Sequence, residues 1–95
     1  MCFEWDDEKE KCNIAKHGID FETAARVFAD ENRIELYDAA HSNEEDRYIT
    51  IGMIGKVMYI VTVVFTERNE AIRLISARKA TKQERRLYND YSQRN

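Results

Sequence analysis

The chain has 95 residues, of which 43% are hydrophobic, 11% aromatic and 35% charged. This composition excludes a disordered chain and provides one small core, so we expect a single domain over residues 1–95. No apolar run approaches the roughly 20 residues that cross a bilayer, and the acidic start from Glu4 argues against a secretory signal peptide. We therefore expect a cytoplasmic protein without membrane contact, in which Cys2 and Cys12 are reduced thiols.

The charge is divided unevenly along the chain. Its net charge is −3, but residues 1–46 carry five basic against 14 acidic side chains, whereas residues 47–95 carry ten basic against four acidic ones. Charges more than about 8 Å apart are largely screened at physiological salt, so the basic half can attract phosphate although the whole protein is acidic. A chance asymmetry on a small solvated domain is the alternative interpretation.

Two short helices are predicted after a short edge strand at residues 2–5. Residues 7–17 follow an Asp N-cap, carry acidic residues early and basic residues late, and end before Gly18, which favours a helix stop. A second helix begins after Asp20 and ends near Asp30. Its apolar side chains recur at helical spacing and share one face: Phe21, Ala24, Ala25 and Phe28.

From residue 33 onward the pattern becomes that of β-strands. Strands are expected around residues 34–37, 47–54, 57–65 and 71–77, with hairpin turns at Gly55-Lys56 and at residues 67–70. Strict alternation in the last strand predicts two faces: Arg73, Ile75 and Ala77 on one, and Ile72, Leu74, Ser76 and Arg78 on the other.

A third helix closes the chain. Thr81 and Glu84 form a capping box, and the inward face of the helix is predicted to consist of Leu87, Tyr88 and Tyr91. The predicted order is therefore β-α-α-β-β-β-β-α, an α+β fold with a mostly antiparallel sheet and its helices on one side.

Several classes of site are excluded by spacing. The cysteines and histidines follow no zinc-site pattern, and the chain has neither a Gly-rich phosphate loop nor a nucleophile elbow. We therefore expect no metal and no other cofactor.

Basic side chains in and beside the predicted sheet are the strongest candidates for chemistry: Arg47, Arg68, Arg73, Arg78 and Lys79. Arginine is costly in a strand unless its guanidinium reaches water, a carboxylate or a phosphate, and its planar fork suits the last two. The arginines either form an anion site or pair with acidic neighbours on a solvated face: Glu44, Glu45, Glu67 and Glu70.

A second cluster lies on the first predicted helix. Lys9, Asn13, Lys16 and His17 fall at i, i+4, i+7 and i+8, so they share one polar face. This face either contacts an RNA backbone, with His17 as a proton carrier near neutral pH, or is solvated, with His17 at the helix end.

Three segments, in this order, carry a resemblance to a known family: FEWDDEKEKCNIAKHGIDFETAARVF, HSNEEDRYITIG and VVFTERNEAIRLISARKATKQERRLY. Together they resemble the BrnT family of type II toxins over nearly the whole chain. Asn69 stands where the family pattern leads us to expect Gly in a turn, but Asn tolerates the positive φ that such a turn needs.

The resemblance implies a RelE-like fold and a ribonuclease that arrests translation. It also implies a BrnA-like antitoxin with a ribbon-helix-helix DNA-binding portion, two toxins around an antitoxin dimer, and DNA contact only through the antitoxin. The acidic residues 1–46 are a candidate surface for a basic antitoxin segment. The alternatives are a non-catalytic RelE-like module that binds protein and a DNA-binding repressor, although the chain lacks a helix-turn-helix signature.

For such a ribonuclease we expect metal-independent cleavage, in which the ribose 2′-OH attacks the adjacent phosphate. We assign charge stabilisation to Arg47, Arg68 and Arg78. The base is Glu45 or Glu67, although arginine neighbours would make either carboxylate a poorer base. The acid is His17 or Lys79. The remaining backbone contacts are assigned to Lys16, Arg73, Lys79 and Lys82.

Overall fold

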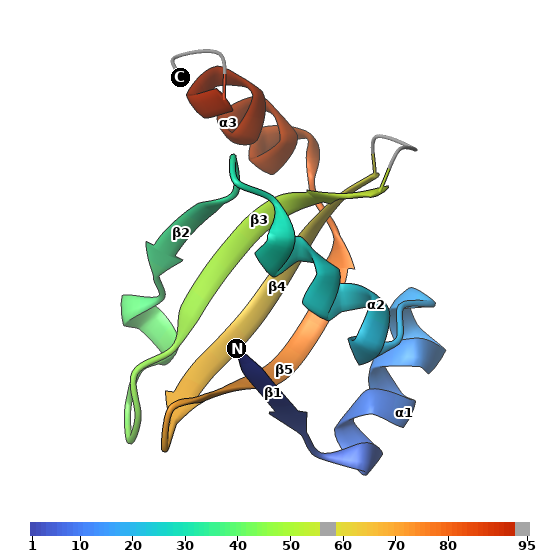
Figure 1. Cartoon of the computed structure of the whole chain (residues 1–95), viewed down its shortest axis with the longest axis vertical. Coiled ribbons are helices and arrows are strands. Elements are labelled where there is room, and N and C mark those ends of the chain that lie inside the picture. Colours follow the sequence, from blue (N-terminus) through green and yellow to red (C-terminus); the bar gives the residue numbers. More distant parts are fainter. Residues whose placement is uncertain (56–58, 93–95) are drawn as a thin grey trace.

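Short helices and a twisted sheet account for nearly all of the chain in the computed structural model, which describes residues 1–55 and 59–92 (Figure 1). The elements, in chain order, are β1 (Cys2–Trp5), α1 (Asp7–His17), α2 (Phe21–Ala25), the 3₁₀ turn η1 (Arg26–Ala29), β2 (Ile34–Tyr37), the 3₁₀ turn η2 (Ala39–His41), β3 (Tyr48–Ile54), β4 (Tyr59–Arg68), β5 (Ala71–Lys79) and α3 (Lys82–Ser92). The predicted element order and the α+β class are confirmed. The part of the predicted Gly55-Lys56 hairpin that covers residues 56–58 lies outside the described residues.

The helix ends follow from local side chains. The Asp6 carboxylate accepts from the backbone N–H groups of Glu8 and Lys9, and Gly18 ends α1 in the left-handed conformation with φ 70°. Asp20 caps α2 in the same way as Asp6 caps α1, through the N–H of Thr23. The expected caps are thus confirmed, because each depends only on neighbours within one helical turn.

The sheet has the order β1-β5-β4-β3-β2, in which β1 runs parallel to β5 and the other neighbours are antiparallel. Asn69 and Glu70 form the turn between β4 and β5, with φ values of 49° and 68°, and Arg68 pairs with Ala71 across it. Positive φ at both central residues gives a two-residue turn whose twist matches that of the strands. The expectation that Asn69 supplies a positive φ is confirmed.

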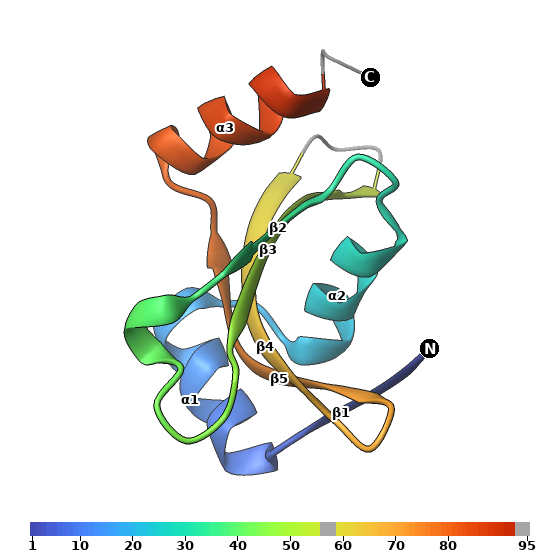
Figure 2. The same cartoon turned by 90° about the vertical axis from the view of Figure 1, so that its left-hand side faces the viewer.

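The two faces of the sheet are covered by different helices, so the expectation that all helices lie on one side is wrong (Figure 2). Phe21, Ala24 and Val27 from α2 and η1 are buried in a cluster with the β4 side chains on one face. Tyr88 of α3 packs on the opposite face with Ile34, Ile51 and Ala80. The chain crosses over because the N–H of Ala80 bonds to the Ile60 carbonyl and the capping box then starts α3 directly.

A bulge in β5 overturns the predicted alternation of its side chains. Ser76 pairs with Val64 and Leu74 pairs with Phe65, so Ile75 is an extra residue in the ladder. Leu74 and Ala77 therefore enter the same buried cluster. The side chains of Ser76 and Arg78 come to lie on the other face of the sheet.

Two predicted apolar faces also needed correction. α2 continues as a 3₁₀ turn, whose tighter winding buries Val27 completely and leaves Ala25 only partly buried. Among residues 82–91 of α3 only Tyr88 is buried, whereas Leu87 and Tyr91 are 45% and 51% exposed, because the helix lies across the end of the sheet (Figure 1). Within residues 1–55 and 59–92 no helix is long and apolar enough to cross a membrane.

Candidate functional site

Asn13 fixes α1 beside the edge of β5. Its Nδ2 donates to the carbonyls of Ala77 and Ile19, both at 2.9 Å, and its Oδ1 accepts from the Ala77 N–H at 3.0 Å. β1 pairs with β5 only as far as Leu74, so the Asn13 amide takes the place of a neighbouring strand beyond that point. The helical spacing had grouped Asn13 with the polar side chains on one face of α1. Asn13 is only 5% exposed, so it does not belong to a solvated polar face.

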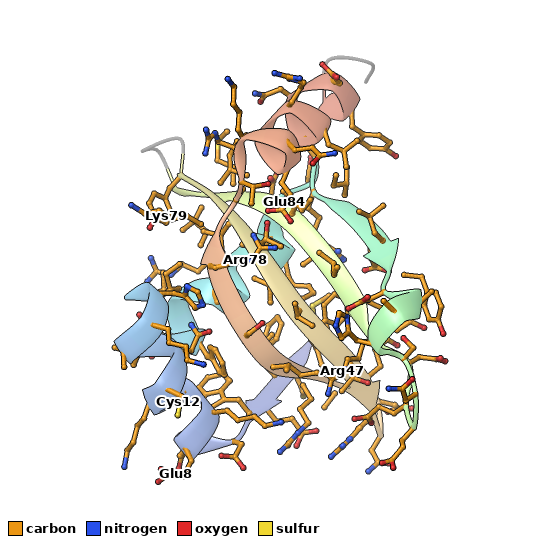
Figure 3. All side chains as sticks on the ribbon, turned by 180° about the vertical axis from the view of Figure 1, so that it is seen from behind. Glu8, Cys12, Arg47, Arg78, Lys79 and Glu84 are labelled. Atoms are coloured by element: carbon orange, nitrogen blue, oxygen red, sulfur yellow. The ribbon has the colours of Figure 1, made fainter. Side chains whose placement is uncertain are left out.

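A groove of about 450 Å³ separates α1 from the face of the sheet that carries Ser76 and Arg78. We call this face the open face, because α3 covers only one end of it and α2 lies on the opposite face. The lining of the groove includes Glu8, Lys9, Lys16 and His17 from α1, Arg47 from the segment before β3, and Ser76 from β5. Figure 3 shows Arg47 on the opposite side of this open face from Cys12 of α1, which also lines the groove. The structure thus brings Arg47 together with Lys16 and His17, which sequence analysis had placed in a different cluster.

The groove carries more basic than acidic side chains: Lys9, Lys16 and Arg47 line it against one carboxylate, that of Glu8. Among the described residues, the side chains of Lys9, Lys16 and Arg47 take part in none of the ion pairs or hydrogen bonds. Hydrogen bonds lower the pKa of the nearby carboxyls of Asp6 and Glu45, and the charges of Lys9 and Arg47, respectively, lower it further, but they form no direct ion pair with these carboxyls. The excess of positive side chains creates a local potential that attracts an anion. The arrangement suits the repeated phosphates of a nucleic acid.

Arg68 and Glu45 form a bidentate pair next to the groove. The guanidinium donates from Nε and one terminal nitrogen to the two carboxylate oxygens, both at 2.8 Å. These hydrogen bonds from Arg68 lower the pKa of Glu45, which makes its carboxylate a weaker base. Glu45 and Arg47 also line a smaller hollow of about 260 Å³, so Arg47 lies between this hollow and the larger groove.

Arg78 is held at the other end of the open face by Glu84. Its two terminal nitrogens donate to the carboxylate at 2.6 and 3.0 Å, and Figure 3 shows the two side chains pointing toward each other. Glu84 also accepts from the Thr62 hydroxyl and the Thr81 N–H. Burial opposes ionisation of Glu84, but the hydrogen bonds from Arg78, Thr81 and Thr62 outweigh it and lower its pKa to about 2.

The other predicted site residues are scattered. Arg73 pairs with Glu4 of β1 at 3.2 Å. Lys79 lies over the Tyr59 ring, 5.3 Å from its centroid, and Tyr59 packs on the face of the sheet that α2 covers. Glu67 pairs with Ile72, so alternation along β4 directs its side chain to that same face. Lys82 is exposed at the start of α3. The structure therefore does not bring Lys79 or Glu67 to the groove.

Sequence analysis missed four residues of the groove: Glu8, Cys12, Ile75 and Ser76. Cys12 lies between Lys9 and Lys16 on one face of α1, and the same helical spacing that linked the lysines also indicates Cys12. Ser76 reaches the open face because of the bulge at Ile75, and no local feature of the sequence indicates that bulge.

The structure is thus a small α+β domain with a groove between its first helix and its sheet, lined by basic side chains of α1 and of the segment before β3. The family model described as the ribonuclease toxin, BrnT, of type II toxin–antitoxin systems matches residues 5–84, so the chain belongs to the BrnT family. This membership confirms the resemblance and implies a ribonuclease toxin with an RNA target and an antitoxin partner. No curated protein matches the chain.

Proposed function

We propose that the groove between α1 and the sheet is the active site of an endoribonuclease that arrests translation. The observation that supports this assignment is that Lys9, Lys16 and Arg47, none of them in an ion pair, line the same groove as His17 and outnumber its one carboxylate, Glu8. A groove with these side chains offers charge for the phosphate and a group that can carry a proton.

The proposed reaction needs no metal ion. The ribose 2′-oxygen forms a bond to phosphorus while the bond from phosphorus to the 5′-oxygen breaks, which gives a 2′,3′-cyclic phosphate and a 5′-hydroxyl. Arg47 and Lys9 stabilise the charge that develops on the phosphate oxygens. Arg78 holds the RNA backbone farther along the open face.

Proton transfer is assigned to α1. Glu45 is held by Arg68, and Glu67 lies toward the other face, so neither carboxylate suits the role of base as well as His17. We assign His17 as the base that takes the proton of the 2′-hydroxyl, because histidine exchanges protons near neutral pH. Lys16, its neighbour in the groove, gives a proton to the leaving 5′-oxygen.

Cleavage of a 5′-labelled single-stranded RNA by the purified chain in excess EDTA tests this proposal. Arg47→Ala and His17→Ala should each lower the rate at least about 100-fold, the usual scale for a lost proton carrier or charge stabiliser. Arg26→Ala, an exposed arginine on η1, is the matched control and should cleave like the wild type. A 2′-deoxy substitution at the cleaved position should block the reaction.

Each part of the proposal has its own contrary result. Loss of cleavage in EDTA would show that a metal ion is needed. Wild-type rates for Arg47→Ala would show that the groove is not the active site. No cleavage by a folded wild-type chain would instead support the non-catalytic, protein-binding module.

We further propose that the antitoxin is BrnA-like and that the complex contains two toxins and two antitoxins, with DNA bound only through the antitoxin. The support is the family's description as the toxin of a type II toxin–antitoxin system. Light scattering of the complex co-purified from its two genes should give the mass of the heterotetramer. A mass equal to one toxin plus one antitoxin would contradict this stoichiometry.

A further inference from the structure

An apolar groove lies at the β2 edge of the sheet, away from the cationic groove at β5. It has a volume of about 640 Å³ and lies between β2, the segment after η1 and α3. Leu36, Leu87 and Tyr91 line it and are 43%, 45% and 51% exposed. They are three of the six exposed large hydrophobic residues in the described part of the chain, so this groove is where unsatisfied apolar surface is concentrated.

The outer edge of β2 presents unused backbone groups beside this groove. The Asp38 N–H donates to the Arg47 carbonyl, and the antiparallel register continues from that pair through Leu36 and Ile49. Bonded and non-bonded pairs alternate along an antiparallel ladder, so the N–H and C=O groups of Glu35 and Tyr37 point away from β3. An edge of this kind can accept a further strand.

The rim of the apolar groove is acidic. Asp30, Glu31 and Glu35 line it, and its one basic residue, Arg33, is already paired with Glu35 at 3.0 Å. A second copy of this chain would bring the same acidic rim against this one, and like charges facing each other across an interface are unfavourable. The charge therefore favours a basic partner over self-association.

We infer that this groove receives the antitoxin, as an extended segment of alternating basic and apolar residues that adds a strand to β2. Its apolar side chains pack on Leu36, Leu87 and Tyr91, and a basic side chain faces Glu31. The inference rests on the proposed pairing with an antitoxin, but it is independent of where RNA is cleaved. It also gives a role to the two side chains of α3 that find no place in the core.

The affinity of the full-length chain for the purified BrnA-like antitoxin encoded beside it tests the inference. Leu87→Arg and Glu31→Arg should each weaken binding at least about tenfold, because each places a positive charge against a basic segment. Ile14→Arg is the matched control, since Ile14 is also 45% exposed but lies on α1, and its affinity should stay within about twofold of the wild type. In the complex, amide exchange at Glu35 and Tyr37 should slow, which reports the added strand directly.

Wild-type affinity for Leu87→Arg, an equal loss for Ile14→Arg, or unchanged exchange at Glu35 and Tyr37 would each overturn the inference. So would a dimer of the chain alone that Leu87→Arg dissociates, because the occupant would then be a second copy. Neither groove variant should change RNA cleavage. If the groove variants lose the antitoxin while no form of the chain cleaves RNA, the docking site stands and the proposed ribonuclease site fails.

Discussion

Asn13 and Ala77, 64 positions apart in the chain, are joined by two hydrogen bonds of opposite direction, at 2.9 and 3.0 Å. The side-chain amide thus pairs with backbone as a strand would, and it seals the part of the β5 edge that β1 leaves open. The same contact holds α1 where Lys16 and His17 face Arg47 across the cationic groove. Asn13 therefore both covers the free edge of β5 and positions α1 beside the groove.

Replacing Asn13 by Ala should destabilise the fold by about 3 kcal/mol, because the N–H and C=O of Ala77 lose their buried partner. Urea denaturation followed by circular dichroism measures this free energy of unfolding. Asn32→Ala is the control, since the Asn32 side chain is exposed, and it should change stability by no more than about 0.5 kcal/mol. Equal midpoints for the two variants would show that the Asn13 bridge contributes nothing.

The ion pair between Glu84 and Arg78 should make the stability of the fold depend on pH in the acid range. The pKa of Glu84 in the folded protein is about 2, below its usual 4.5, so ionised Glu84 stabilises the fold above pH 4.5. This contribution, at most about 3 kcal/mol, is lost as the pH falls from 4.5 toward 2. Arg78 is 38% exposed, and solvent screening reduces the value further.

Glu84→Gln should therefore be less stable than the wild type at pH 7, and its stability should fall less steeply between pH 4.5 and 2. Urea midpoints at a series of pH values give both quantities. Glu22→Gln, on the exposed side of α2, should follow the wild-type curve. Parallel curves for Glu84→Gln and the wild type would contradict the prediction.

Features set by neighbouring residues could be predicted from the sequence. The caps at Asp6 and Asp20, the stop at Gly18 and the Thr81–Glu84 box depend on hydrogen bonds within a few residues. The bulge at Ile75 and the crossing of α3 to the other face depend on packing between distant elements. Alternation and helical periodicity carry no signal for such packing.

The candidate site divides in the same way. Helical spacing correctly placed Lys16 and His17 on one side of α1, since both line the cationic groove. That Arg47 joins them depends on how the segment before β3 crosses the sheet, which no local pattern indicates. From the sequence, Glu67 and Lys79 were equally strong candidates for the site. Strand alternation at Glu67 and the contact of Lys79 with Tyr59 place both side chains toward the face that α2 covers.

RNA affinity should depend on salt through the cations of the groove. Lys16→Ala should reduce the slope of log affinity against log salt by about 0.7, the value for one lost phosphate contact on a single strand. Fluorescence anisotropy with a 2′-O-methyl RNA, which cannot be cleaved by attack of the 2′-oxygen, measures the slope. Lys79→Ala removes the same charge from the Tyr59 side of the sheet and should leave the slope unchanged. The opposite result would place RNA on the face covered by α2.

Glu45 should orient Arg68 and not act as the base. Its pKa is lowered by the hydrogen bonds from Arg68, so it holds a proton poorly during turnover. Glu45→Gln keeps one oxygen acceptor for the guanidinium, and its cleavage rate should fall less than about tenfold, whereas loss of a general base costs about 100-fold or more. His17→Ala should show that larger loss.

Single-turnover rates between about pH 5 and pH 8, where folded proteins are usually most stable, separate the two roles of Glu45. If His17 is the base, the rise of the rate from acid toward neutral pH persists in Glu45→Gln and disappears in His17→Ala. If that rise disappears in Glu45→Gln instead, Glu45 takes the proton of the 2′-hydroxyl despite its pair with Arg68. Arg68→Ala then provides the deciding comparison, because freeing a true base from its arginine raises its pKa and moves the acid limb toward neutral pH.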